Sequence, residues 1–170
     1  MTPILRRALP SDVVALSEVG KTTFVETFGH LYKPEDLAAF LEHAYSLERT
    51  SRDLANPDKA SWIVESGSEV IGYALAGPCG LPHPEVKPED GELNRLYMKR
   101  GHQSGGLGSR MCAEALAWLE SVGRHRIWIG VWSENFGAQR FYGRLGFEKV
   151  GEYLFPVGET RDLEFILRRG

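Results

Sequence analysis

A glycine-rich turn between a strand-like run and a helix-like run constrains the fold of this sequence more than any other feature. The strand-like run covers residues 92–98, the turn is Gln103-Ser104-Gly105-Gly106-Leu107-Gly108, and the helix-like run continues to residue 122. Such a unit points backbone N–H groups and the positive end of the helix dipole at one spot, where an anion is stabilised without a metal. The sequence therefore predicts a phosphate-binding turn, with a tight connection that binds nothing as the alternative.

Two familiar phosphate loops do not fit this turn. A nucleotide-hydrolase loop ends in Gly-Lys-Ser/Thr, whereas Gly108 is followed by Ser109-Arg110 and the phosphate-binding lysine is missing. A dinucleotide loop needs a third glycine where this chain has Met111, and no acid ends the next strand-like run, 126–129. The turn must belong to another class of phosphate site.

Caps, periodicity and turn residues predict the remaining elements. Two or three helices are expected before a strand hairpin, and a long loop at 77–91 is expected after it. The expected strands cover residues 4–9, 61–65, 70–76, 92–98, 126–132, 148–154 and 161–167. The expected helices are 13–28, a stretch from Pro34, 108–122 and a stretch that ends near residue 145.

A second motif follows the strand-like run 126–132 and reads Asn135-x-x-Ala138-x-x-Phe141-Tyr142-x-x-x-Gly146-Phe147. With Gln103-x-x-Gly106-x-Gly108, which fits a Gln/Arg-x-x-Gly-x-Gly/Ala loop, it makes the chain resemble the GNAT N-acetyltransferase superfamily. The likeness covers roughly residues 92–150. Two independent motifs in the right order and separation make coincidence a poor explanation.

The resemblance implies an α/β (α+β) fold with a mixed, mostly antiparallel twisted sheet of about seven strands and about four helices. Two neighbouring parallel strands, 92–98 and 126–132, would splay apart to admit acetyl-coenzyme A. Parallel strands need a helical crossover, and the helix from Gly108 supplies one.

The resemblance also assigns the residues that hold acetyl-CoA. Backbone groups of the strand Leu96-Tyr97-Met98 would pair with the pantetheine arm, and Asn135 would hydrogen-bond it or cap its own helix. Tyr142 would lie beside the thioester. The pyrophosphate would lie against the turn residues Gln103, Ser104, Gly105, Gly106, Leu107, Gly108 and Ser109.

Attack of a neutral amine on a thioester needs one group that accepts a proton and one that donates a proton. The resemblance makes Tyr142 the acid that protonates the sulfur, with an ordinary core tyrosine as the alternative. Glu92 would take the amine proton through water; an exposed strand-end glutamate, with water alone as the base, is the alternative. Asn94, expected on the same strand face as Glu92, cannot act as a base.

Residues 23–29 and 35–41, together with 127–132, resemble the bacterial PaiA-type polyamine acetyltransferases, a likeness that spans nearly the whole chain. A polycationic acceptor would suit acidic residues near the cleft, while the plainer reading is that each acid caps or solvates a helix. The acids in question are Glu26, Glu35, Asp36 and Glu134. Acetylation of a protein N-terminus or lysine, and an acyl-CoA sensor without catalysis, are the competing functions.

Composition limits the number of domains, the class of partner and the cellular location that can be expected. A chain of 170 residues with 42% hydrophobic residues suits one domain, 1–170. A net charge of −3 and a pI near 6.0 argue against nucleic acid as a partner. No apolar run fits a signal peptide or membrane span, so a cytoplasmic protein without a membrane partner is expected.

The spacing of cysteines and histidines predicts no metal site. Cys79 and Cys112 lie far apart, which excludes a zinc-type Cys-x-x-Cys pair and favours a reducing compartment. The five histidines show no metal-ligand spacing. A homodimer is left open, because such sheets often pair through their C-terminal strands.

Overall fold

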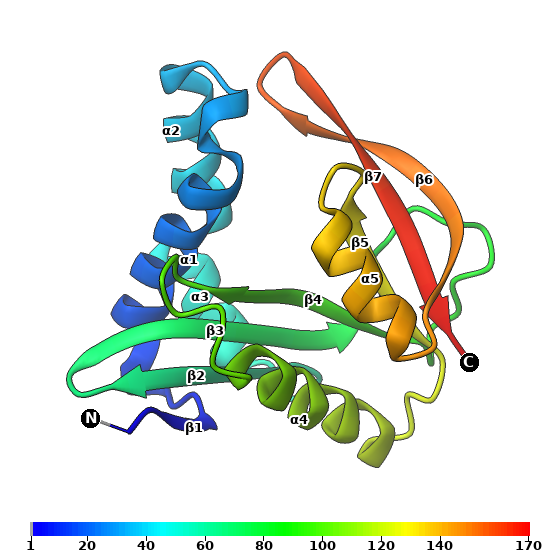
Figure 1. Cartoon of the computed structure of the whole chain (residues 1–170), viewed down its shortest axis with the longest axis horizontal. Coiled ribbons are helices and arrows are strands. Elements are labelled where there is room, and N and C mark those ends of the chain that lie inside the picture. The colour runs from blue at the N-terminus through cyan, green and yellow to red at the C-terminus, as the bar shows by residue number, and fades with distance from the viewer. Residues whose placement is uncertain (1) are drawn as a thin grey trace.

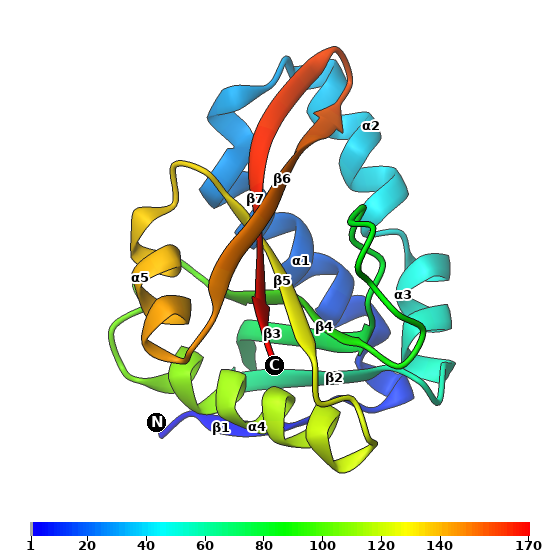
Figure 2. The same ribbon diagram turned by 90° about the vertical axis from the view of Figure 1, so that its right-hand side faces the viewer.

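The computed structural model describes residues 2–170, which form seven strands in one sheet and five α-helices. The strand order is β1-β2-β3-β4-β5-β7-β6, and every neighbouring pair is antiparallel except β4 and β5. Figures 1 and 2 show α4 and the N-terminal helices on either side of β2–β4, with the long β6–β7 hairpin beyond β5. The mixed, mostly antiparallel sheet confirms the predicted fold class.

The element bounds are close to those predicted. The strands are β1 (Ile4–Arg7), β2 (Ala60–Ser66), β3 (Glu69–Pro78), β4 (Gly91–Met98), β5 (Ile127–Trp132), β6 (Glu148–Val157) and β7 (Thr160–Arg169). The helices are α1 (Val13–Phe28), α2 (Pro34–Ala44), α3 (Leu47–Ala55), α4 (Leu107–Ser121) and α5 (Phe136–Arg144), with 3-10 turns at Pro10–Asp12 and Gly29–Leu31.

Helix α3 is the element that the sequence prediction did not locate. Its N-cap is Ser46, whose hydroxyl accepts the Arg49 N–H at 3.1 Å. The prediction also ended β1 two residues late and made both strands of the last hairpin too short. That hairpin turns only at Gly158, which has a positive φ of 57° that favours glycine.

Strands β4 and β5 pair for only two residues of each strand. Gly91 lies opposite Ile127 and Glu92 opposite Trp128, and the parallel pairing ends there. Beyond this point the two strands diverge, as Figure 1 shows, and α4 provides the crossover between them. The splayed pair expected from the resemblance is therefore present.

Two apolar cores lie on opposite faces of the sheet. On one face, Met111 of α4 and Tyr142 of α5 belong to a cluster with Ile129 of β5. On the other face, Phe24 of α1 packs in a second cluster with Tyr73 of β3. Burial on both faces explains why all of residues 60–64 in β2 are buried, a pattern typical of a central strand.

Strand β4 contains a β-bulge at Asn94. Leu75 of β3 pairs with Arg95, and the next residue, Ala76, pairs with Leu93, so Asn94 is left without a partner in the ladder. The extra residue shifts the alternation of side chains along β4. Asn94 lines the same cavity as Glu92, as expected, and Arg95 and Tyr97, which follow the bulge, line it too.

Among the described residues, no helix combines the length and the apolar character that crossing a membrane requires.

Candidate active site

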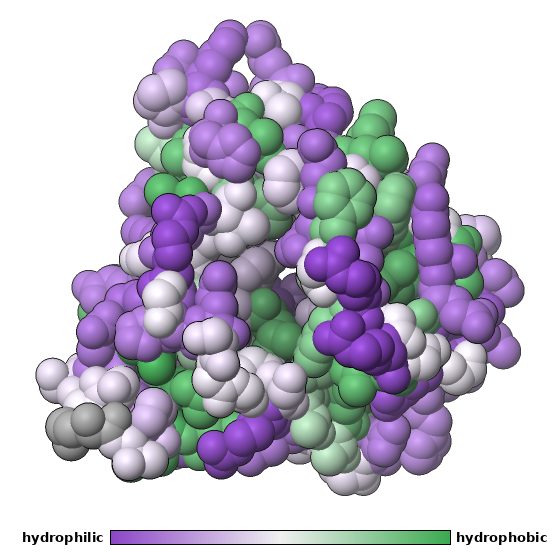
Figure 3. All heavy atoms as spheres, viewed as in Figure 1, coloured by the Kyte–Doolittle hydropathy of each residue, from purple (hydrophilic) through white to green (hydrophobic). Residues whose placement is uncertain are grey.

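Two cavities of about 420 Å³ each meet at the splay between β4 and β5. The first lies between β4, β5 and α5, and the second lies between β4, the helices α1–α3 and the hairpin β6–β7. Six residues line both: Phe28, Asn94, Arg95, Tyr97, Gly130 and Glu164. Figure 3 shows the surface hollowed between the N-terminal helices and the β5–β7 side. The two cavities thus form one passage across the sheet.

The glycine-rich turn has the geometry of an anion site. Gly106 precedes α4 with a φ of 74°, in the left-handed region, and a Cβ built on it would meet no atom within 4 Å. The first N–H that bonds back into the turn is that of Arg110, which donates to the Gly106 carbonyl at 3.1 Å. The N–H groups of residues 107–109 therefore have no partner within α4 and face the helix N-terminus.

Several predicted cofactor residues line the first cavity, and the others form the turn beside it. Gln103 connects the turn to strand β4, because its side-chain amide donates a hydrogen bond to the Met98 carbonyl at 3.3 Å. The predicted residues that line the cavity are Leu96, Tyr97, Met98, Gln103, Asn135 and Tyr142. The predicted residues that form the turn and the start of α4 are Ser104, Gly105, Gly106, Leu107, Gly108 and Ser109.

Tyr142 is a buried residue of α5 whose side chain lines the first cavity. Its ring packs edge-on against Phe147, with centroids 6.0 Å apart. Burial, with a smaller effect from nearby Cys112, raises the pKa of the Tyr142 phenol well above its usual value. A phenol with this pKa keeps its proton at neutral pH, which suits a donor and not an acceptor of protons.

Asn135 begins α5 and also lines the first cavity. Its side-chain oxygen accepts the Ala138 N–H at 3.1 Å, so the predicted N-cap is present. Gly137 and Gly143 do not interrupt the helix.

Glu92 is buried and lines the second cavity but not the first. Its Oε1 accepts the Gly80 N–H at 2.9 Å. Burial raises the pKa of the Glu92 carboxyl above its ordinary value, although the Gly80 hydrogen bond opposes this shift. The exposed strand-end glutamate offered as an alternative is excluded by this burial.

Glu164 of β7 is a carboxylate that the sequence reasoning missed. It lies opposite Trp132 of β5 and Tyr153 of β6, and it is the acidic residue that lines both cavities among the residues described. Its Oε2 is shielded from solvent and has no hydrogen-bond partner. Burial, reinforced by the charge of Asp162, raises the pKa of Glu164 to about 7. The available signal was an acid between two apolar strand residues, Leu163 and Phe165.

The other predicted acids are divided between the site and the surface. Glu26 and Glu134 line the first cavity, whereas Glu35 and Asp36 lie in the first turn of α2 and line neither cavity. The prediction that all four lie near the acceptor cleft is therefore wrong for the α2 pair, and the Asp36 side chain lies instead beside Gly158 at the turn of the β6–β7 hairpin. Aromatic residues of the N-terminal helices line the second cavity and also pack in the core, among them Phe24, Phe28 and Tyr32.

No cluster of three or more His, Cys, Asp or Glu side chains suited to a metal ion occurs within residues 2–170.

Comparison with known proteins defines the class of this site. The model of the acetyltransferase (GNAT) family matches residues 25–147, which is more than half of the chain. The chain belongs to this family and is an acetyl-CoA-dependent N-acetyltransferase, with acetyl-CoA as its co-substrate.

The relatives with similar sequences span nearly the whole chain. An uncharacterized N-acetyltransferase of Lactobacillus delbrueckii subsp. lactis is 30% identical over 162 residues, which is 93% of this chain and 91% of that protein. An uncharacterized N-acetyltransferase of Mycobacterium tuberculosis is 27% identical over 159 residues, which is 94% of this chain and 97% of that protein.

Solved structures share the fold at lower identity. The PaiA N-acetyltransferase of Thermoplasma acidophilum, solved in complex with coenzyme A, superimposes with a TM-score of 0.76 at 20% identity and 99% coverage of both chains. The ribosomal-protein-S18-alanine N-acetyltransferase of Escherichia coli superimposes with a TM-score of 0.70 at 15% identity, covering 98% of this chain and 92% of that chain.

Proposed function

We propose that this N-acetyltransferase acetylates the primary amine of a small molecule by direct attack, with Tyr142 as the general acid. The observation that carries this proposal is the passage formed by the two cavities, which has the buried phenol of Tyr142 in the first cavity and the carboxylates of Glu92 and Glu164 in the second. A proton donor near the sulfur and a proton acceptor near the amine accelerate attack on a thioester.

The first cavity suits acetyl-CoA, which supplies the thioester carbon and the sulfur leaving group. The free N–H groups at the start of α4 suit the pyrophosphate, and the open space in front of Gly106 leaves room for it. The exposed edge of β4 beyond Glu92, where pairing with β5 has ended, suits an extended arm. Asn135 and the segment 96–98 line the space between these points.

Two carboxylates compete for the role of base. Glu92, the predicted base, lines only the second cavity, and one of its oxygens already accepts a hydrogen bond from Gly80. Glu164 lines both cavities, has an oxygen without a partner and has a pKa near neutral pH, which is the value that best suits a general base. We therefore favour Glu164 as the proton acceptor, with Glu92 as its competitor.

Glu164 takes one proton from the substrate ammonium, and the neutral nitrogen bonds to the carbonyl carbon as the carbon–sulfur bond breaks. Tyr142 gives its proton to the departing sulfur and regains one from the nitrogen. Glu164 then releases its proton to solvent, so that one amide, one thiol and one free proton result.

The resemblance to PaiA-type enzymes suggests a polyamine as the acceptor, but the acids that would attract it, Glu26 and Glu134, line the first cavity, which suits the cofactor. Protein N-termini are the alternative, since the E. coli neighbour is named for one. The aromatic walls of the second cavity, which include Phe24, Phe28 and Tyr32, favour a small acceptor over a polypeptide.

The test is the rate of CoA-thiol release from acetyl-CoA with spermidine, spermine, amino acids, aminoglycosides and lysine peptides. We expect a small amine to be the best acceptor and Tyr142→Phe to slow its acetylation by about a hundredfold or more. Tyr73→Phe is the matched control, because the Tyr73 hydroxyl is buried without a partner and lies outside both cavities. A lysine peptide as the best acceptor, or full activity in Tyr142→Phe, would overturn the proposal.

A further inference from the structure

The second cavity contains cationic side chains that a polyamine site would not need. Arg49, Lys59 and Arg95 line it together with the acids Asp53, Glu92 and Glu164. Lys59 and Asp53 neutralise each other, since Lys59 Nζ lies 2.9 Å from Asp53 Oδ1. Two guanidinium groups are left to face the space in which the acceptor binds.

Arg95 follows the bulge in β4 and lines both cavities. Its guanidinium carbon lies 4.4 Å from the centre of the Tyr45 ring, and its one hydrogen bond to the described chain is a long one of 3.4 Å to the Ala44 carbonyl. No carboxylate oxygen of residues 2–170 lies within ion-pair distance of it. A guanidinium has five N–H donors, so most of those on Arg95 are free.

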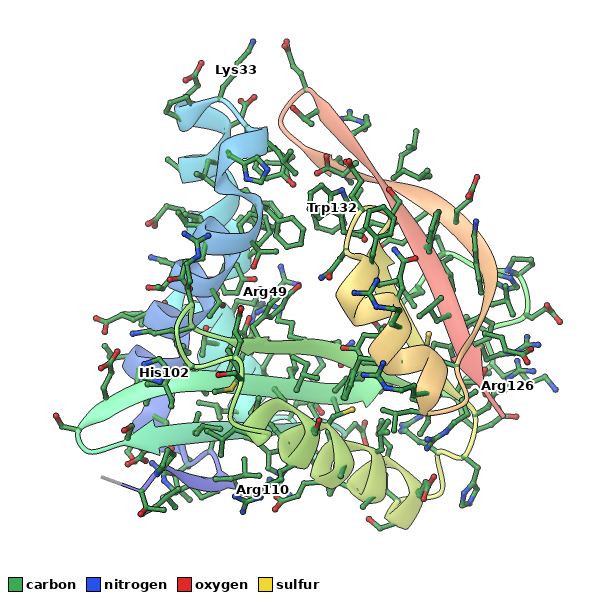
Figure 4. The ribbon with its side chains drawn as sticks, viewed as in Figure 1. Lys33, Arg49, His102, Arg110, Arg126 and Trp132 are labelled. Carbon is green, nitrogen blue, oxygen red and sulfur yellow. The ribbon has the colours of Figure 1, made fainter. Side chains whose placement is uncertain are left out.

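Arg49 lies in the first turn of α3 and is partly buried. Its backbone N–H is used by the Ser46 cap, whereas its side chain forms no hydrogen bond or ion pair with the described part of the chain. Figure 4 shows Arg49 above β4, between the N-terminal helices and the β5–β7 side. The partly buried arginines Arg6 and Arg126, by contrast, each lie against a carboxylate.

Each of these two guanidinium groups lacks a carboxylate within ion-pair distance, although Asp53, Glu92 and Glu164 line the same cavity, so its free N–H donors can bind the anionic group of a ligand. The planar fork of arginine matches a carboxylate in a two-point contact better than it matches a single point charge. At the junction of the cavities, Glu164 and Asn94 present oxygens without partners, which suit an ammonium group. Aromatic rings lie between, among them Phe40 and Phe155.

We propose that the acceptor is an amine that also carries a carboxylate, such as an amino acid or a short peptide with an apolar body, and that Arg49 and Arg95 bind this carboxylate. The proposal rests on the proposed function, since it names the substrate class of the same site. It excludes a polyamine as the preferred acceptor, because a polyamine has no group for the two arginines.

The experiment compares three acceptors that differ only at the acid end: an amino acid, its neutral amide and its phosphonate analogue. The comparison is made once with the amine on the α carbon and once with the amine at the far end of the chain, which varies the distance between the amine and the anionic group. CoA-thiol release gives kcat/KM for each acceptor. We expect the carboxylate to be preferred to the amide by ten- to a hundredfold, the range of a charge-assisted hydrogen bond, and to the phosphonate by a smaller factor.

Arg49→Gln is the variant of choice, because Arg49 lines only the second cavity whereas Arg95 lines both, and because its loss leaves α3 capped by Ser46. It should narrow the preference for acid over amide by about tenfold, mainly through KM, and Arg49→Lys should restore part of it. The two acceptors differ in the pKa of their amines, but this difference is the same for both proteins and cancels when the acid-to-amide ratio of the variant is divided by that of the wild type. Arg52→Gln, on the exposed surface of the same helix, is the matched control and should leave the ratio unchanged.

Three outcomes would overturn the inference: equal rates for acid and amide, an unchanged ratio in Arg49→Gln, or spermidine as the best acceptor. In each case acetylation of some amine would still support the proposed function. If acetyl-CoA binds by calorimetry but no acceptor in the panel is acetylated, the proposed function fails and the inference fails with it. A preference for the phosphonate would show that the site takes phosphate-like anions in place of carboxylates.

Discussion

Replacement of Glu164 by glutamine should change the pH dependence of catalysis in a way that identifies the base. The Glu164 carboxyl has a pKa of about 7, so the base form falls about tenfold for each pH unit below 7 and is nearly complete above 8. Glu164→Gln should lower kcat/KM by roughly a hundredfold or more above pH 8, the usual contribution of a general base.

The assay is CoA-thiol release between pH 5.5 and 9, with the ratio of wild-type to variant kcat/KM plotted against pH. The ratio removes the ionisation of the substrate amine, which both proteins share. It should rise about tenfold per unit up to pH 7 and then level off. Glu92→Gln, measured in the same way, should give a ratio that does not change with pH, because this variant keeps Glu164 as the base. A flat ratio for Glu164→Gln, or a ratio that rises with pH for Glu92→Gln alone, would refute the assignment.

The same variant should unfold less readily. The folded-state pKa of Glu164, about 7, lies above the ordinary glutamate value of 4.5, so the folded state holds the proton more tightly and loses stability as pH rises from 4.5 to 7. A shift of this size corresponds to about 3 kcal/mol at most, and partial solvent exposure reduces it to about 2 kcal/mol. Glu164→Gln should be more stable than wild type by about this amount at pH 8 and equal to it at pH 4, as urea denaturation can measure.

Three further changes test the cofactor side of the site. Gly106→Ala should raise the KM for acetyl-CoA at least several-fold and cost about 1 kcal/mol of stability, since a φ of 74° is unfavourable for alanine; an unchanged KM would contradict the anion site. Asn135→Ala should lower thermal stability by about 1 kcal/mol, the value of a lost N-cap. Tyr142→Phe should bind acetyl-CoA with wild-type affinity while turnover collapses, and a weakened affinity measured by calorimetry would point to a structural role.

The sequence predicted the parts of the site that depend on neighbouring residues. The glycine-rich turn, the crossover helix and the Asn135 cap are local features, because their backbone geometry depends on residues within one or two turns. The splay between β4 and β5 came from the family resemblance, and the two-residue pairing of these strands confirms it.

The parts that the sequence did not predict depend on contacts between distant segments. Glu164 reaches the junction of the cavities because β7 pairs between β5 and β6, which no local pattern reveals. The bulge at Asn94 depends on the register of β3 against β4, and one extra residue shifts the side chains that follow. Arg49 lies in α3, a helix that the sequence did not locate, so its position at the second cavity was not predicted.

The most direct test of the central claim is to follow a labelled acetyl group from acetyl-CoA by mass spectrometry. The account predicts that the label appears in amide linkage on the nitrogen of a small amine, with one free CoA thiol for each acetyl group transferred. If the protein binds acetyl-CoA but the label stays on CoA, or appears only as free acetate at the rate of the protein-free reaction, the claim that this chain acetylates a small amine is contradicted.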